Sequence, residues 1–159
     1  MSAIQLQTLC RSAHFAASRE RVFQAWTNAE ELKQWWSPGR YTTTAVDIDL
    51  RPGGHYRLTM RHPDGSSATL SGKYLEVVAP ESIVMTWISV GGPRDHGHEA
   101  LLTLEFLDRG GATELKLTHE RLPAASKDSY DSGWTALIEE LHSHLSTDSK
   151  HPLLAGSRA

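Results

Sequence analysis

Apolar and polar residues alternate with a period of two through the middle of the chain, from Tyr41 to Glu120. The first two predicted strands carry Val46, Ile48 and Leu50, then Tyr56, Leu58 and Met60, and the third runs from Thr69 to Val78. The last three carry Ile83, Met85 and Trp87, then Leu102, Leu104 and Phe106, and finally Leu115 and Leu117 followed by His119. Turn-forming strings such as Arg51-Pro52-Gly53-Gly54 separate these segments. The pattern predicts six antiparallel strands whose sheet is covered on one face and solvated on the other.

The residues before this region predict a strand and two short helices. Ile4 to Phe15 alternates enough to be a first strand. Ser18 stands where the N-cap of a helix belongs, and Asn28 followed by Glu31 predicts a second helix directly after the first. The apolar positions of the second helix are Leu32, Trp35 and Trp36.

The residues after this region predict one long amphipathic helix. A single helical stripe is formed by Tyr130, Trp134, Leu137, Ile138, Leu141 and Leu145. We expect this stripe to face the sheet, while Glu139, Glu140 and His142 remain exposed. The composition after Thr147 predicts a flexible tail, so the domain is expected to span 1–147 and the tail 148–159.

The predicted order of strand, two helices, six strands and one helix indicates an α+β helix-grip fold, a curved antiparallel sheet wrapped around a long C-terminal helix. A sheet that curls around one helix rarely fills its interior, so we expect a cavity between them. The residues predicted to line this cavity and bind a ligand are Trp35, Tyr56, Met60, Met85, Trp87, His119, Trp134 and Ile138.

Several local strings resemble the START-like superfamily, also called the SRPBCC or polyketide-cyclase-like superfamily. The strings are Arg19 to Thr27, Leu32 to Pro38, Asp49 to Arg57, Met85 to Trp87, Leu115 to His119, and Gly133-Trp134. The closest similarity is to the branch named after the C-terminal domain of the activator of 90-kDa heat-shock protein ATPase. The resemblance implies the helix-grip fold over about 12–145. It does not imply one activity, because the superfamily mixes lipid carriers, cyclases and stress proteins.

Charge and composition restrict the classes of partner. The net charge of −3 gives no basic field for a phosphate backbone, so we expect no nucleic-acid partner. No apolar run is long enough to span a bilayer, and Met1 to Leu9 does not have the pattern of a signal peptide. With Cys10 as the one cysteine, these features predict a cytoplasmic protein without a disulfide. The strand pattern does not decide the oligomeric state, which is expected to be a monomer or a weak homodimer.

Histidines are the main candidates for chemistry. His119 shares strand parity with Leu117, so we expect it to point inward, either bonded to a ligand or satisfied within the core. His96 and His98 could share a strand face beside Glu99, but no third metal ligand follows at a familiar spacing, so no metal is expected. His142 and His144 are expected to be surface residues on different sides of the last helix.

The sequence is therefore compatible with three functions. The first is a binding protein that holds a hydrophobic or amphipathic small molecule, with no cofactor and no assigned catalytic residue. The second is a cyclase- or hydrolase-type enzyme that uses His119 as acid or base. The third is an interaction module, related to stress responses, that acts on a chaperone or a regulator. No nucleophile elbow or phosphate-binding loop is visible, which favours the first function over an enzyme.

Overall fold

The computed structural model describes residues 5–37, 40–91 and 99–150, with the backbone alone for 147–150. Its elements are β1 (Leu6–Phe15), α1 (Arg19–Thr27), α2 (Ala29–Trp35), β2 (Thr42–Ile48), β3 (His55–Arg61), β4 (Ser67–Val78), β5 (Ser82–Val90), β6 (Ala100–Arg109), β7 (Ala112–Pro123), η1 (Ala124–Ser126) and α3 (Lys127–Lys150). This order confirms the predicted helix-grip fold. The sequence pattern did not predict the short 3₁₀ helix η1.

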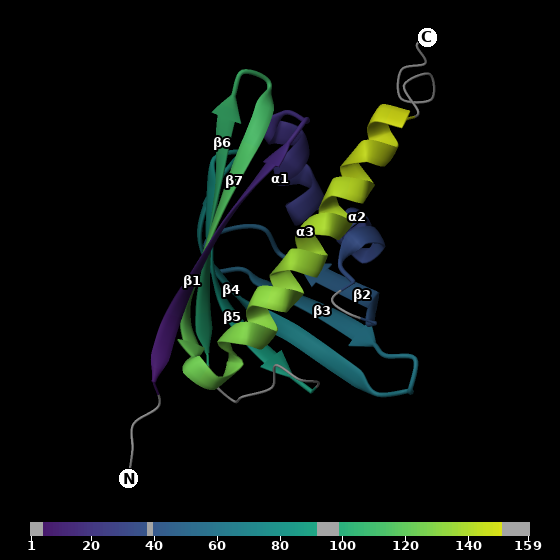
Figure 1. Cartoon of the computed structure of the whole chain (residues 1–159), viewed down its shortest axis with the longest axis vertical. Coiled ribbons are helices and arrows are strands. Elements are labelled where there is room, and N and C mark those ends of the chain that lie inside the picture. The colour runs from purple at the N-terminus through teal and green to yellow at the C-terminus, as the bar shows by residue number, and fades with distance from the viewer. Residues whose placement is uncertain (1–4, 38–39, 92–98, 151–159) are drawn as a thin grey trace.

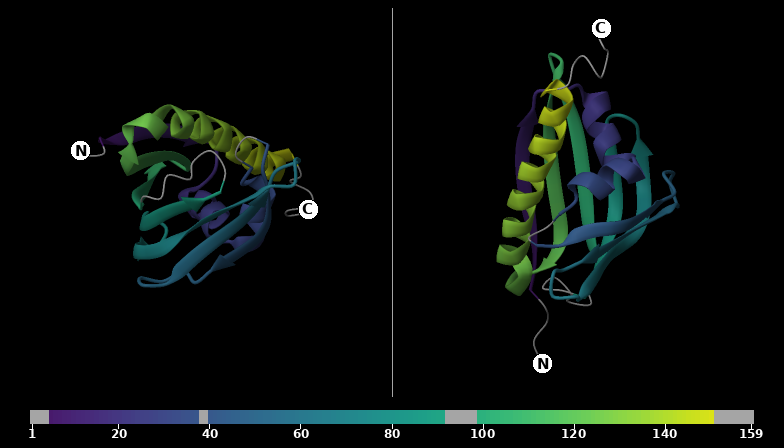
Figure 2. Two further views of the ribbon diagram at one scale, coloured as in Figure 1. Left: turned by 90° about the horizontal axis from the view of Figure 1, so that it is seen from below. Right: turned by 90° about the vertical axis from the view of Figure 1, so that its right-hand side faces the viewer.

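The strands form one antiparallel sheet in the order β1-β7-β6-β5-β4-β3-β2. The first strand of the chain pairs with the last, with Leu9 opposite His119. The sheet curls, and α3 lies across its concave inner face (Figure 1). Seen from below, the strands bend around the space beneath α3 (Figure 2). The predicted space between sheet and helix is therefore where the core lies.

Helices α1 and α2 begin at the predicted caps. The Oγ atom of Ser18 accepts a hydrogen bond from the amide of Arg21, and Oδ1 of Asn28 accepts one from the amide of Glu31. Each bond satisfies one of the free amides of a first helical turn. Because Asn28 is at once the C-cap of α1 and the N-cap of α2, the chain turns sharply between them.

The stripe on α3 faces the sheet as predicted. Its members Tyr130, Trp134, Leu137, Leu141 and Leu145 are buried, while Ile138 is half-buried and packs against the core. On the opposite side of the helix, Glu139, Glu140 and His142 are exposed. The helix continues to Lys150, beyond the predicted domain end at 147, and the remainder of the predicted tail lies outside the described residues.

Polar contacts hold the first turns of α3 against the edge of the sheet. Nη1 of Arg11 on β1 lies 2.9 Å from Oδ1 of Asp131 and 3.0 Å from Oγ1 of Thr135. The Asp131 side chain is 58% exposed, so solvent weakens this ion pair.

A second set of contacts joins the last turns of α3 to α2, and it corrects one sequence-based expectation. Nε2 of His144 lies 2.8 Å from Oε1 of Glu31, and Nη1 of Arg21 lies 2.8 Å from the same oxygen. The His144 side chain is only 14% exposed. His144 is therefore not a free surface residue, because the second turn from the end of α3 crosses over the start of α2.

Strands β4 and β5 approach each other closely at Gly72. A Cβ atom at this position would overlap the carbonyl oxygen of Thr86. That carbonyl accepts a 2.7 Å hydrogen bond from the hydroxyl of Tyr56, and Oγ1 of Thr86 accepts one from the amide of Lys73 at 2.8 Å. A glycine is therefore required at this close approach of the two strands.

Replacing Gly72 by Ala tests this close approach. An alanine in a strand normally stabilises relative to glycine by restricting the unfolded chain. Here the clash with Thr86 reverses the sign, and the free energy of unfolding falls by about 1–3 kcal/mol. Urea denaturation measures the loss, and Ser71→Ala on the outer face, expected within about 0.5 kcal/mol of the parent, is the control. A Gly72→Ala variant as stable as the parent would contradict the packing described.

Candidate functional site

A cavity lies between α3 and the inner face of β3, β4 and β5. Its lining comprises Met60, Ala68, Leu70, Trp87 and Ser89 from the sheet, Tyr130, Gly133, Trp134 and Leu137 from α3, and Trp36, Tyr41 and Gly91 from the adjoining segments. The empty space, including the open mouth, is about 490 Å³, but only about 40 Å³ of it can hold the centre of a water molecule. Aromatic side chains therefore already occupy most of the predicted cavity.

The lining is aromatic and aliphatic. Among the described lining residues no side chain carries a charge. Its polar groups are the hydroxyls of Tyr41, Ser89 and Tyr130, together with the three indole N–H groups of Trp36, Trp87 and Trp134. The indole N–H of Trp87 donates to the Tyr130 hydroxyl over 3.2 Å. Such a site suits an uncharged molecule, because an ion buried here would lose its hydration without a compensating partner.

Three of the eight residues predicted to bind a ligand line this cavity: Met60, Trp87 and Trp134. Their strand or helix parity places them on inner faces that meet at the cavity. The other five, Trp35, Tyr56, Met85, His119 and Ile138, do not line it.

Trp36 lines the cavity where Trp35 was expected to do so. Trp35, the last residue of α2, turns back toward α1 and donates its indole N–H to the carbonyl of Ala25 over 2.9 Å. Trp36 follows the helix in an extended conformation, with φ −77° and ψ 92°, and reaches the cavity. The residue at which α2 ends decides which indole meets the cavity.

Tyr56, Met85 and Ile138 belong to the core around the cavity. The buried Tyr56 hydroxyl donates to the Thr86 carbonyl, and burial, followed by its neighbours Tyr74, Tyr130 and Glu99, raises the pKa of the Tyr56 phenol. Met85 is buried on β5 one inner-face position before Trp87. Ile138 packs at the edge of the core.

His119 lies behind the wall of the cavity and is completely buried. Its Nδ1 atom accepts a 3.0 Å hydrogen bond from the indole N–H of Trp134, and its ring centroid lies 4.6 Å from that of Trp87. An indole nitrogen can only donate, so Nδ1 must carry the lone pair and the ring proton must sit on Nε2. The lone pair a general base would need is therefore already engaged by Trp134, which weighs against the enzyme hypothesis.

Sequence reasoning did not assign Trp36, Tyr41, Tyr130 or Gly133 to the cavity. Tyr130 was placed on the buried stripe, but its hydroxyl bond to Trp87 has no signal in the sequence. Gly133 did leave a signal: a buried glycine in a helix interior, next to a tryptophan, leaves room where a larger residue would pack.

The five indoles of the chain form one continuous cluster, and three of them, Trp36, Trp87 and Trp134, line the cavity. The Trp134 ring centroid lies 5.5 Å from that of Trp87, 6.0 Å from Trp36 and 6.1 Å from Trp26. Trp35 joins through Trp26 at 5.0 Å. Rings at these separations and tilted angles attract one another beyond simple burial.

The described residues contain neither a cluster of metal ligands nor a membrane-spanning helix. In the part of the chain that the structure describes, no three His, Cys, Asp or Glu side chains gather as they would around a metal ion. His96 and His98 lie outside the described residues. Within 5–37, 40–91 and 99–150, no helix is long and apolar enough to cross a membrane.

The curled sheet, the single long helix and the cavity between them define the class of START-like helix-grip proteins. Solved structures agree: a protein from Rhizobium leguminosarum has a TM-score of 0.78 at 22% identity, covering 91% of this chain and 97% of its own. A protein of unknown function from Staphylococcus aureus has a TM-score of 0.77 at 21% identity, covering 93% and 98%. At these identities the likeness concerns the fold alone.

The sequence assigns the family within this class. The family described as activator of Hsp90 ATPase homolog 1-like protein matches residues 16–146, so the chain belongs to it. The human protein named activator of 90 kDa heat shock protein ATPase homolog 1 is 28% identical over 120 residues, which cover 76% of this chain. The mouse protein named homolog 2 is 25% identical over 120 residues. The matched region is 31% of the human protein and 32% of the mouse protein.

Replacing Trp134 by Phe tests the bond to His119. The substitution keeps an aromatic ring but leaves Nδ1 of His119 without its donor, which costs about 1–3 kcal/mol of unfolding free energy beyond the lost volume. Trp26→Phe is the matched control, because the buried Nε1 of Trp26 makes no hydrogen bond in the described part of the chain. Urea denaturation should show Trp134→Phe to be the more destabilising change. Equal losses would mean that the His119 bond contributes nothing.

Proposed function

We propose that this protein binds a small uncharged molecule, hydrophobic or amphipathic, between α3 and the inner face of the sheet. The observation that carries the proposal is the lining: aromatic and aliphatic, with no charge among its described residues. Pockets for small molecules combine such walls with a few polar groups that orient the ligand. The family assignment supports a binding role of this kind and leaves the ligand unnamed.

The polar groups of the cavity suggest how a ligand would be oriented. The indole N–H groups of Trp87 and Trp134 already have acceptors. The hydroxyls of Tyr41 and Ser89 line the cavity, are only half-buried, and make no hydrogen bond within the described residues. A ligand would therefore place its apolar part against the indoles and its polar end toward these two hydroxyls.

The small free volume sets a condition on binding. About 40 Å³ holds the centres of only a few water molecules, so a ligand of ten or more heavy atoms requires side chains to move. Tyr41 is half-buried and lies at the boundary of the cavity, which makes it the lining aromatic best placed to move. Ligand binding then changes the surroundings of Trp36 and Trp87, and tryptophan emission reports it.

A fluorescence titration with a cavity-filling variant tests the proposal. Fatty acids, flavonoids and uncharged polycyclic aromatics form the panel, and we expect at least one saturable change in emission from the uncharged aromatics. Ala68 is buried in the lining, so Ala68→Leu fills the cavity and should weaken binding at least about tenfold, the equivalent of about 1.4 kcal/mol.

Ala45→Leu is the matched control, because Ala45 is exposed on β2. It should bind as the parent does. Native mass spectrometry of freshly purified protein checks independently for a co-purified molecule. If no member of the panel binds, or if Ala68→Leu binds equally well, the cavity is not a ligand site.

A second candidate function is an interaction module of the co-chaperone kind. Two observations favour it: the relatives are named activators of 90-kDa heat-shock protein ATPase, and the cavity is almost filled by its own side chains. The partner would then be a chaperone, and the role a cytoplasmic one in stress. The ATPase rate of a 90-kDa heat-shock protein, measured with and without this protein, should rise if this second function holds and stay constant if it does not.

A further inference from the structure

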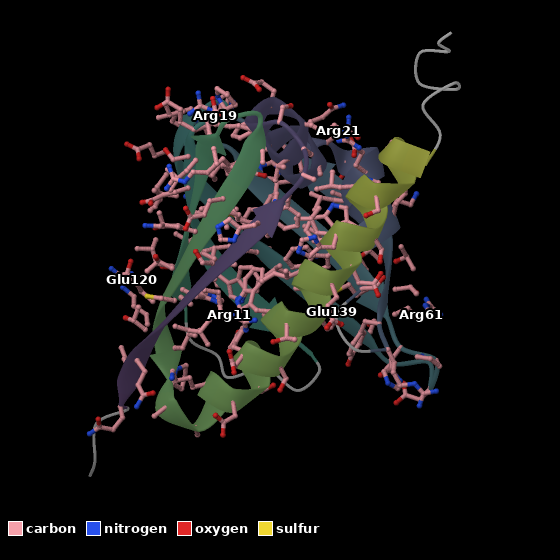
Figure 3. The ribbon with its side chains drawn as sticks, turned by 45° about the horizontal axis from the view of Figure 1, so that its top comes forward. Arg11, Arg19, Arg21, Arg61, Glu120 and Glu139 are labelled. Carbon is pink, nitrogen blue, oxygen red and sulfur yellow. The ribbon has the colours of Figure 1, made fainter. Side chains whose placement is uncertain are left out.

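The outer face of the sheet carries a local excess of positive charge, although the whole chain has a net charge of −3. The residues responsible are Arg57 and Arg61 on β3 and Lys73 on β4, and together with the neighbouring His55 on β3 they are here called the outer basic face. All four are exposed, and they alternate along their strands with buried residues of the inner face. His55 stands directly opposite Lys73 across the strand pair. In Figure 3, Arg61 lies on the β3 side of the molecule, pointing away from the ribbon.

These cations lack partners. Among the described residues, Arg57, Arg61 and Lys73 take part in no ion pair within 4.0 Å. Asp47 is opposite Arg57 in the pairing of β2 with β3, yet the two side chains do not pair. Cations on one sheet face repel one another, and this repulsion destabilises the folded protein. A bound anion would reduce the repulsion.

A groove runs beside these cations across β3, β4 and β5. Its volume is about 570 Å³ and it is open to solvent. Arg57 and Lys73 line it together with hydroxyl side chains, and Ile88 and Val90 line its β5 side. Val90 is 55% exposed, an aliphatic surface directly next to a cationic one.

We propose that the outer basic face binds an acidic segment of a partner polypeptide, lying extended across β3, β4 and β5. Carboxylates of the segment pair with Arg57 and Lys73, and its aliphatic side chains cover Ile88 and Val90. Arg61 continues the row of cations four residues further along β3, which suits an extended chain better than a single compact anion. This surface is on the opposite face of the sheet from the cavity, so the two sites are independent.

Charge and side-chain type favour a polypeptide over a nucleic acid. Single-stranded nucleic acids are held by exposed aromatic side chains on which bases stack. The large exposed hydrophobic residues in the described part of the chain are all aliphatic: Leu6, Leu50, Leu75, Val78 and Val90. The exposed carboxylates of Asp47, opposite Arg57, and of Glu99, in the groove lining, interrupt the row of cations, which suits a segment with spaced carboxylates better than a continuous phosphate backbone.

Binding of a synthetic peptide tests the proposal on the intact chain. The probe is a fluorescein-labelled 12-residue peptide of three Glu-Glu-Val-Val repeats, which presents both side-chain types on each side of an extended chain and, at about 3.3 Å per residue, is longer than the outer basic face. The comparison probes are the same peptide with Gln for Glu, and oligouridine of equal length. We expect saturable anisotropy with the Glu peptide, weakened by salt, and none with the Gln peptide at about 1 mM.

A charge reversal with a matched control locates the binding. Arg57→Glu with Lys73→Glu should raise the Kd of the Glu peptide about tenfold or more. Lys33→Glu with Lys116→Glu makes the same change in net charge at exposed residues on α2 and β7, and should change the Kd less than about twofold. The Arg57/Lys73 variant should keep the cavity's ligand response, so failure of this site is distinguishable from failure of the proposed function.

Four outcomes would overturn the proposal. They are equal binding of the Glu peptide by both double variants, equal binding of the Gln peptide, tighter binding of oligouridine, and no binding of any probe at about 1 mM. Backbone amide shifts in NMR spectra supply a separate check, because the Glu peptide must perturb β3 to β5 and leave α3 unchanged.

Discussion

The docking of the apolar stripe of α3 on the inner face of the sheet is the contact on which the rest of this structure depends. Burial of a large apolar side chain contributes roughly 1.5–3 kcal/mol, and five large side chains of α3 are buried here. Trp134 lies at the centre, in ring contact with indoles from α1, β5 and the end of α2. Helix, sheet and helical corner therefore meet at one side chain, and the cavity is the space left around it.

The sequence allowed the fold to be predicted almost completely, because period-two and helical patterns record which face each residue turns to the core. Parity placed Met60 and Trp87 inside, and the helical stripe placed Trp134 beside them. The same patterns were insufficient for the choice between Trp35 and Trp36. That choice depends on the single residue at which α2 ends, and a one-residue shift in a helix end turns the next side chain through a large angle.

The chemistry of the site was harder to predict than its position. Parity placed His119 inside, but its role follows from a bond to a residue on another element, which no local pattern records. His144 shows the same limit: its neighbours on α3 indicate a surface position, and only the crossing of α3 over α2 brings it to Glu31. Contacts between distant segments are set by the angle at which elements cross, and a strand or helix pattern does not contain that angle.

The pairing of β1 with β7 has a consequence for folding during synthesis on the ribosome. Within this domain β1 is synthesised before the other strands, and its hydrogen-bonding partner β7 is the last strand to emerge, since Leu9 pairs with His119. Until then β1 has no partner in the sheet, and the stripe that seals the core has not been made. Closing a loop of this length costs conformational entropy before native contacts compensate for it. We therefore expect folding to be slow and to be completed only after α3 has been synthesised. A chain cut short before α3 would present the inner face of the sheet to solvent, and quality-control proteases or chaperones would meet it in that form.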